Sequence, residues 1–188
     1  PVKYSIISGD EFTGVTSFRI DEGLDTGPML AYLTTQIAPS ETATELLDRL
    51  SIEGAQLALA TLSGIDNGSI LPLHQPIDGI SRAPKITVAD AQVRWNDPAL
   101  AVDRRIRAVT KDPGAWTMFG DVRVKLQPVT VSPHVTDLAP GEVQMRDGEV
   151  LVGTGSHAVA LDQVQEAGRN LTDAKTWFSN QKSAVVFE

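Results

Sequence analysis

The segment that most constrains the fold is a strand, a glycine-bounded loop and a second strand near the start of the chain. Side chains alternate in type along residues 15–20, with the period of two that is typical of a β-strand. Gly23 and Gly27 then let the backbone turn sharply, Pro28 stiffens the exit, and an extended run follows over residues 29–37. The pattern predicts two strands that hold one loop rigidly between them.

Asp25 lies at the tip of this loop. An acid held between two strands is a reasonable position for a group that moves a proton in catalysis. The alternative is that Asp25 only closes a turn with its own backbone, as Asp beside Gly commonly does. The residues alone favour this structural role.

An amphipathic helix is expected over residues 42–63. Thr42 and Glu45 form a capping-box pattern, in which each side chain accepts a hydrogen bond from a free N–H of the first turn. Gly64 is a natural stop signal. The apolar residues at helical spacing, which we expect to pack on the strands, are Leu46, Leu47, Leu50, Leu57, Ala58 and Leu62.

The order strand, loop, strand, helix is typical of the end of an α/β domain. Two strands and one helix cannot close a hydrophobic core on their own. The first residue is Pro1 rather than Met, and the chain opens within a pattern. The sequence therefore predicts a fragment of a longer protein, in which the earlier part of this domain precedes Pro1.

The second half has different patterns. Residues 66–87 lack periodicity and are rich in Gly and Pro, which predicts an extended linker. A helix is expected over residues 98–110, with Pro98 in its first turn. The side chains expected to face the core are Leu100, Ala101, Ile106 and Val109, and those expected largely outside are Arg104, Arg105 and Arg107.

Short strands should follow this helix, at residues 115–119, 122–131, 141–146, 149–153 and 157–164. Asp147-Gly148 is a strong signal for a hairpin turn. Thr172 is expected to cap a last short helix that runs through Phe178. Five or six short strands with one helix near the start indicate a small β-barrel of the OB type.

The chain is acidic overall but basic in its middle. The net charge of −8 argues against indiscriminate nucleic-acid binding. Residues 1–79 carry a net charge of −8, residues 82–125 carry +4, and residues 126–188 carry −4. The simplest interpretation of the positive middle is a solvated face with intermixed ion pairs, and the alternative is a surface for an anionic partner.

Composition excludes several classes of protein and site. With no cysteine, the chain has neither disulfides nor a thiolate metal site, and we expect no metal site of another kind because no ligand cluster stands out. No apolar run is long enough to span a membrane, so no membrane partner is expected. The chain does not open with a basic and then apolar leader, and we expect a cytoplasmic protein.

These motifs resemble those of the folate-dependent formyltransferase family, most closely the methionyl-tRNA formyltransferases within it. Residues 23–28 resemble the family loop that bears a catalytic aspartate, and residues 9–16 resemble the strand before it. In the second half, the resemblance continues through Trp95, residues 113–117 and residues 167–171. It covers nearly the whole chain.

The resemblance implies transfer of a formyl group from 10-formyltetrahydrofolate to the amino group of methionyl initiator tRNA, in translation initiation. It implies that Asp25 is catalytic, because the family aspartate orients a histidine and helps with proton transfer. The implied fold is the end of a Rossmann-like formyltransferase domain (residues 1–67), a linker (residues 68–87) and an OB-like C-terminal β-barrel (residues 88–188). We expect a monomer.

The resemblance also suggests a partner for the basic zone. Lys85 falls on a lysine of the family linker, and loops of the barrel could follow tRNA phosphates. The tRNA-binding candidates are Lys85, Arg104, Arg107, Lys111, Arg123 and Lys125. Trp116 could stack on a base, but a Trp within a strand is more often part of the core. Arg94 and Arg105 could instead pair with Asp90 and Asp103.

The chain departs from the family at the residues that bind the oxyanion, the negatively charged oxygen of the tetrahedral intermediate in formyl transfer. The family binds it with an asparagine and a histidine upstream of the aspartate, and no residue of this chain can stand for either. That strand, and most of the formyl-donor site, would precede Pro1, while His74, His134 and His157 are expected to be structural or exposed. We therefore expect this chain alone to transfer no formyl group.

Other functions stay open at this point. One is an aminosugar formyltransferase of the same superfamily, which the positive middle zone disfavours. Another is a non-catalytic RNA-binding module, which the Asp25 loop disfavours. The last is a structural domain whose charges are only solvated.

Overall fold

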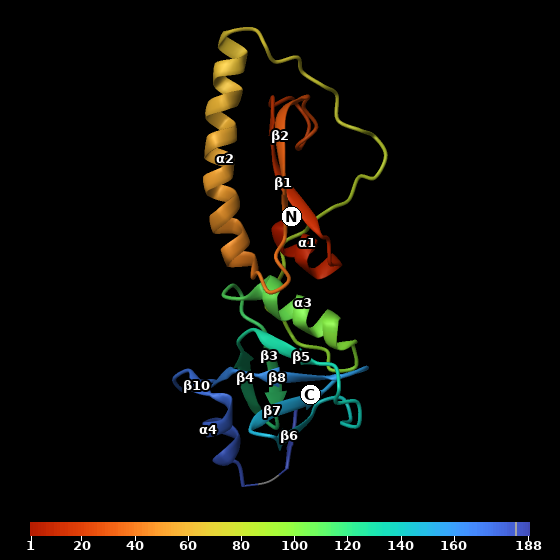
Figure 1. Ribbon diagram of the computed structural model, residues 1–188, viewed down its shortest axis with the longest axis vertical. Coiled ribbons are helices and arrows are strands. Elements are labelled where there is room, and N and C mark those ends of the chain that lie inside the picture. The colour runs from red at the N-terminus through yellow and green to blue at the C-terminus, as the bar shows by residue number, and fades with distance from the viewer. Residues whose placement is uncertain (183) are drawn as a thin grey trace.

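The computed structural model describes residues 1–182 and 184–188, and Figure 1 shows an elongated molecule with two packed parts. One part holds a long helix beside a β-hairpin, and the other holds the remaining strands and the C-terminus. A helix in the middle of the chain, α3 (Ala99–Val109), lies between them. No helix within the described ranges is both long and apolar enough to cross a membrane.

The predicted hairpin is confirmed. β1 (Phe12–Phe18) and β2 (Met29–Gln36) pair antiparallel, with Val15 opposite Leu33 near the middle. Val15 also packs against the apolar core formed by the helices of this part. The loop that joins the two strands is the segment that carries Asp25.

The predicted capping box of the long helix is also in place. In α2 (Ala43–Asp66), the Thr42 hydroxyl accepts a hydrogen bond from the N–H of Glu45, and the Glu45 carboxylate accepts one from the N–H of Thr42. That backbone donor lowers the pKa of Glu45 from its ordinary value. Leu46 and Leu50 are buried against the rest of this part.

Some details of this helix were predicted wrongly. Leu47 and Leu62 were expected to pack on the strands, but they are 48% and 64% exposed. Gly64 does not end the helix, which continues to Asp66. Instead, a Cβ at Gly64 would lie 2.7 Å from the side chain of Ile70, so this glycine allows the start of the linker to pack closely on the helix.

A short first helix was not predicted. α1 (Val2–Ser8) buries Ile6 and ends at Gly9, whose φ of 78° is the left-handed conformation that favours glycine. Seven residues without a cap signal are too few to stand out in the sequence. The helix is held by packing, because Ile6 lies in one core cluster with side chains of α2 and α3.

The segment at residues 68–87 contains no helix and no strand of the sheets in the part that the structure describes. Figure 1 shows it descending from the end of α2 on the opposite side of the hairpin. Leu73 forms an isolated antiparallel bridge with Met29, in which each backbone N–H donates to the other carbonyl at 2.7 and 2.8 Å. The hairpin therefore lies between α2 and this segment.

The C-terminal part contains nine strands among the described residues, more than the five or six predicted. One sheet has the order β10-β9-β4-β3, built from β3 (Trp116–Phe119), β4 (Val122–Leu126), β9 (Gln163–Glu166) and β10 (Thr172–Asp173). The other has the order β11-β6-β7-β8-β5, built from β5 (Val129–Ser132), β6 (Glu142–Arg146), β7 (Glu149–Gly153), β8 (Ala158–Leu161) and β11 (Val185–Val186).

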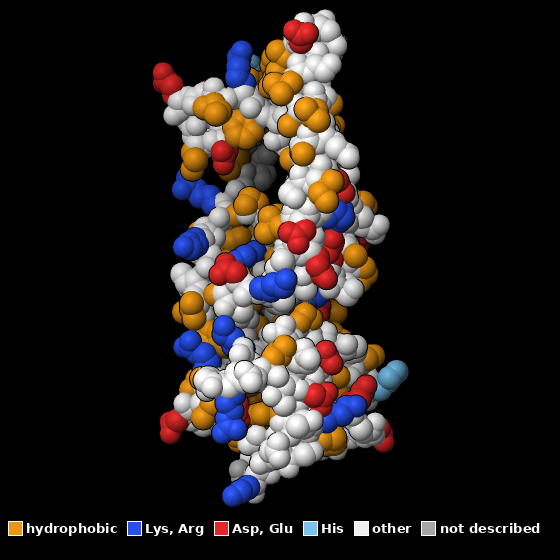
Figure 2. Space-filling view, turned by 90° about the vertical axis from the view of Figure 1, so that its left-hand side faces the viewer, with side chains coloured by type: hydrophobic (Ala, Val, Ile, Leu, Met, Phe, Trp, Pro, Cys, Tyr) orange, Lys and Arg blue, Asp and Glu red, His pale blue; other side chains and the backbone are white. Residues whose placement is uncertain are grey.

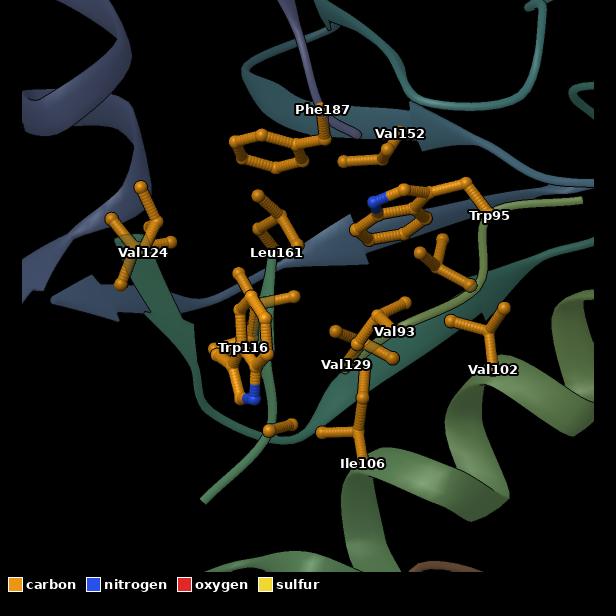
Figure 3. Packing of buried hydrophobic residues seen from close by; sticks show 14 of the residues in the cluster. Val93, Trp95, Val102, Ile106, Trp116, Val124, Val129, Val152, Leu161 and Phe187 are labelled. Carbon is orange, nitrogen blue, oxygen red and sulfur yellow. The ribbon is translucent and has the colours of Figure 1, made fainter. Parts of the chain in front are cut away.

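The two sheets share one hydrophobic core, which Figure 3 shows from close by. Val102 and Ile106 point from α3 toward this core. The ring of Phe187 stacks with both Trp95 and Trp177, at centroid distances of 5.6 and 5.7 Å. Among the described residues of this C-terminal part, the strands form two hydrogen-bonded sheets, and a closed barrel is not seen.

Two predicted strands are each divided in the structure. The strand expected at 122–131 is broken at Pro128, which has no N–H to donate to a partner strand. The strand expected at 157–164 is broken at Asp162. Both breaks lie where the chain passes from one sheet to the other, which local periodicity cannot reveal.

The predicted turn at Asp147-Gly148 is confirmed. Both residues have positive φ, 50° and 79°, as a two-residue hairpin turn between β6 and β7 requires. The cap of the last helix, α4 (Ala174–Ser179), was predicted one residue too early. Asp173, the last residue of β10, accepts hydrogen bonds from two backbone N–H groups of the first turn.

Helix α3 joins the two parts of the molecule. Its Ile106 and Val109 lie in the core of the sheets, while Ala108 lies in the core of α1 and α2. Leu100, which was expected to be buried, is 59% exposed. Because both faces of the helix are packed, the two parts are held together by apolar contact as well as by the linker.

Candidate functional site

The loop that carries Asp25 is exposed and is held by hydrogen bonds rather than by packing. Residues 21–26 are all solvent-exposed. Asp25 has a φ of 56°, a left-handed conformation that is uncommon for a residue with a side chain. Because such a conformation costs about 1 kcal/mol or more, other contacts must hold it.

The turn-closing role belongs to a different acid. Asp21 Oδ1 accepts hydrogen bonds from the N–H of Gly23 at 3.0 Å and from the hydroxyl of Thr26 at 2.7 Å. The carboxylate of Asp25 receives no hydrogen bond from any residue in the described ranges. The structural alternative for Asp25 is therefore wrong, and its carboxylate is available for another contact.

Two further contacts shape this loop. The Nε2 of Gln75 donates to the carbonyl of Asp25 at 2.8 Å and to that of Gly27 at 2.7 Å. A Cβ at Gly27 would lie 1.6 Å from the carbonyl oxygen of Arg19, so the strand exit passes too close for any other residue. Sequence reasoning did not find Gln75, because it lies in a stretch without periodicity.

The candidate tRNA-binding residues fall into two groups. Lys85, Lys111, Arg123 and Lys125 are exposed. Arg123 and Lys125 alternate along β4, and with the turn after β9 they line a shallow groove of about 300 Å³. In the view of Figure 2, Lys and Arg side chains recur along the left-hand edge of the molecule, with acidic groups among them.

The prediction for Arg107 was wrong in one respect, because this side chain is buried rather than outside. Its Nε donates to Asp103 at 2.9 Å and its Nη1 donates to the carbonyl of Glu41 at 2.8 Å. The two charged side chains are 9% and 13% exposed. Burial raises the pKa of Asp103 despite the partner, which lowers it. Arg107 therefore links α3 to the start of α2.

Arg104 is less exposed than the other candidate tRNA-binding residues that lie on the surface. It is half-buried, and its guanidinium lies where a Cβ on Gly9 would be, 2.2 Å from the ideal position of that atom. A cation at this point lies beside the C-terminus of α1, where the helix dipole is negative. The Arg104 side chain therefore packs against the end of α1, in addition to any contact that it makes with a partner molecule.

Two sequence-based alternatives can now be resolved. Trp116 is 9% exposed within the core, and its Nε1 donates to the carbonyl of Val88 at 2.6 Å. The guanidinium of Arg123 covers its ring at 4.2 Å, so the ring has no free face for a base. Arg105 does contact Asp90, but through the backbone carbonyl at 2.8 Å, and Asp103 pairs with Arg107 instead.

The three histidines do not gather at the Asp25 loop through any hydrogen bond among the described residues. His157 contacts the hydroxyl of Ser156 at 3.1 Å, far along the chain in the C-terminal part. No group of three or more His, Asp or Glu side chains in those ranges could hold a metal ion. The chemistry that this site offers is that of an exposed carboxylate, that of Asp25, on a fixed loop.

Comparisons with known proteins agree with the sequence motifs. A family model described as "Formyl transferase" matches residues 1–62, and one described as "Formyl transferase, C-terminal domain" matches residues 85–182. A methionyl-tRNA formyltransferase of Paenarthrobacter aurescens is 50% identical over 190 residues, which cover 100% of this chain and 62% of that protein. This chain thus spans less than two thirds of the length of the curated relatives it matches.

Solved structures show the same fold at lower identity. HypX from Aquifex aeolicus, solved in complex with tetrahydrofolic acid, has a TM-score of 0.70 at 22% identity, over 94% of this chain and 32% of that one. An N-formyltransferase from Helicobacter canadensis, solved with folinic acid and dTDP-3-aminofucose, has a TM-score of 0.69 at 18% identity, over 85% of this chain and 59% of that one. The mixed α/β arrangement of sheets is therefore a formyltransferase fold.

Proposed function

Because the chain belongs to the formyl transferase family, we propose that it is part of an enzyme that transfers a formyl group from 10-formyltetrahydrofolate to the amino group of methionyl initiator tRNA. The observation that carries this proposal is the 50% identity to a methionyl-tRNA formyltransferase, which extends over the whole chain. The geometry agrees with it, because the loop that resembles the catalytic loop of the family holds a free carboxylate.

The reaction defines what Asp25 would do. The amine nitrogen bonds to the formyl carbon and gives a tetrahedral oxyanion, and then the bond from that carbon to the folate nitrogen breaks. One proton leaves the amine and one returns to the folate nitrogen, so the site needs a group that handles protons and donors that stabilise the oxyanion. We assign the first role to Asp25, acting with a histidine that it orients.

We propose that the oxyanion donors and most of the site for the formyl donor lie upstream of Pro1, because this chain covers only 62% of the relative's length. The described residues of this loop supply the carboxylate of Asp25 and the hydrogen bonds that hold the loop. We therefore propose that this chain alone is inactive. Formyl transfer by the purified chain, free of any longer form, would contradict that proposal.

We propose that tRNA phosphates contact the exposed basic residues of the middle segment together with the half-buried Arg104. The set is Lys85, Arg104, Lys111, Arg123 and Lys125. Arg107 is left out, because its donors are used within the protein. Positive charge on an otherwise acidic chain favours a local phosphate-binding surface over binding spread across the whole protein.

We also propose a domain layout. Residues 1–67 would be the end of the catalytic domain, residues 68–87 the linker, and residues 88–188 an OB-like β-barrel domain. Support for the last comes from the two sheets that share one core, with α3 inserted near the start. We further propose a monomer that works in the cytoplasm.

The decisive experiment compares the full-length enzyme with its Asp25→Asn variant in formyl transfer to methionyl initiator tRNA. Asp25→Asn keeps the shape of the side chain but removes its charge, so we expect the rate to fall by about a hundredfold or more. An inactive full-length enzyme on this tRNA would refute the proposal. Activity on an amino sugar instead would favour the related sugar formyltransferases.

The tRNA surface is tested by the salt dependence of binding. Lys125→Ala in the full-length enzyme should weaken tRNA binding and reduce the slope of log K against log salt concentration by about one unit. Lys175→Ala is the matched control, because it removes the same charge from the exposed face of α4, outside the basic zone. Equal effects of the two variants would refute the assigned surface.

A further inference from the structure

The linker touches the Asp25 loop at one half-buried side chain. Residues 71–74 and 76–79 are exposed, whereas Gln75 between them is partly buried. Two residues earlier, the backbone bridge from Leu73 to Met29 fixes the linker beside the start of β2. This bridge places Gln75 directly over the loop.

The orientation of the Gln75 amide follows from its partners. Both partners are backbone carbonyl oxygens, of Asp25 at 2.8 Å and of Gly27 at 2.7 Å. A carbonyl can only accept, so the amide nitrogen and not the oxygen must face them. One side chain thus uses both N–H donors to hold the residue that carries the carboxylate and the residue two positions later.

The Asp25 loop has few other external supports. The hydrogen bonds that Asp21 accepts lie within the loop itself, and the exposed side chains at 21–26 give the loop little packing. The N–H of Arg19 donates to the carbonyl of Pro28 at 3.0 Å, but this bond closes the base of the loop from within, and among the hydrogen bonds of the described residues those of Gln75 reach the loop from outside it. Gln75 is therefore the contact from the linker that reaches the left-handed backbone of Asp25.

We propose that Gln75 is a positioning residue for the reaction, which holds the backbone of Asp25 so that its carboxylate points consistently at the reacting groups. This inference rests on the proposed function of Asp25. It assigns to the linker a role in catalysis in addition to its role of connecting the two parts. A misplacement of about 1 Å in a catalytic group can lower a rate about a hundredfold.

The kinetic test uses two variants of the full-length enzyme, Gln75→Met and Gln75→Glu, with Asp25→Asn measured in parallel. Both keep the length of the side chain and remove the two donors. We expect kcat to fall by about tenfold or more, with KM for donor and acceptor changed by less than about twofold. The same substitutions at Gln36 are the control, because Gln36 lies exposed at the other end of the hairpin and its side chain makes no hydrogen bond with the residues that the structure describes.

The pH profile separates the two variants. A carboxylate in Gln75→Glu would face two carbonyl oxygens, so this variant should be slower than Gln75→Met at neutral pH. Protonation supplies one O–H donor, so its rate relative to the native enzyme should rise as the pH falls. Gln75→Met should show no such rise. A kcat within about twofold of native in both variants, while Asp25→Asn loses its activity, would overturn the proposal.

A second readout does not depend on the assigned reaction. Amide hydrogen exchange of a peptide covering residues 21–28 should be faster in both Gln75 variants and unchanged in both Gln36 variants. Unchanged exchange at the loop would overturn the positioning role even if kcat falls. If Asp25→Asn stays fully active, the proposed function fails, and the exchange experiment still shows whether Gln75 holds the loop.

Discussion

The buried pair of Arg107 and Asp103 supports a quantitative prediction about stability. Arg107→Ala removes a 2.9 Å ion pair and the 2.8 Å hydrogen bond to the carbonyl of Glu41. It leaves the carboxylate of Asp103 nearly buried without a partner. Breaking a buried pair in this way costs about 3–5 kcal/mol, whereas an exposed pair contributes about 0–1 kcal/mol. We therefore expect Arg107→Ala to lower the free energy of unfolding by about 3–5 kcal/mol.

The pH dependence of that loss has a defined sign. Burial already raises the pKa of Asp103, and removal of Arg107 should raise it further. The penalty arises from the charged form, so it is fully present above the folded-state pKa and shrinks as the pH falls through that value. The loss of stability should therefore be largest at neutral pH and smaller under acidic conditions.

The assay is urea denaturation followed by tryptophan fluorescence, with the free energy of unfolding extrapolated to water. The double variant Arg107→Met, Asp103→Leu is the control, because it replaces both charges by apolar groups. It should recover most of the loss, to within about 1–2 kcal/mol of native. A cost below about 1 kcal/mol for Arg107→Ala would refute the reasoning, and a loss of tRNA affinity without loss of stability would restore Arg107 as a contact residue.

Two further predictions follow from the hairpin and its helix. Arg49 lowers the pKa of Glu41 through hydrogen bonds of 2.9 Å, so this carboxylate contributes stability that is present above its ordinary pKa of 4.5 and is lost as the pH falls through the lowered value. Glu41→Gln should therefore lower the melting temperature at neutral pH, and it should weaken the decrease of the melting temperature below about pH 4.5, as measured by calorimetry. The same decrease of melting temperature with pH in the variant and the native protein would contradict this. Gly27→Ala should lower formyl transfer by the full-length enzyme by about tenfold or more, because the new Cβ must displace the backbone at Arg19. Gly54→Ala is the control for this variant, because the nearest atoms to a Cβ at Gly54 lie 3.4 Å away. Since alanine favours a helix, Gly54→Ala should raise the melting temperature.

Several elements could be predicted because their signals are local. The alternation along β1, the capping box at Thr42 and the Asp147-Gly148 turn each depend on neighbours within a few residues, and each is found in the structure. The same holds for the loop around Asp25, whose glycines mark it in the sequence. Elements without a local signal were missed, such as α1, which depends on packing of Ile6.

The tertiary structure decided how charged and polar residues are used. The sequence placed Arg107 on a helix with the other arginines, but only the packing of α2 on α3 shows that its donors face Asp103 and Glu41. Likewise, the breaks at Pro128 and Asp162 follow from a change of sheet, which is set by distant strands.

The sequence by itself determined that an acid lies on a glycine-bounded loop between two strands, because turn chemistry is written in adjacent residues. It did not determine which acid closes the turn, since Asp21 and Asp25 are both compatible with that role. Nor could it show that Gln75, 50 residues away, holds the loop. Those assignments depend on contacts between segments that are distant in the chain, and only the folded chain brings them within hydrogen-bonding distance.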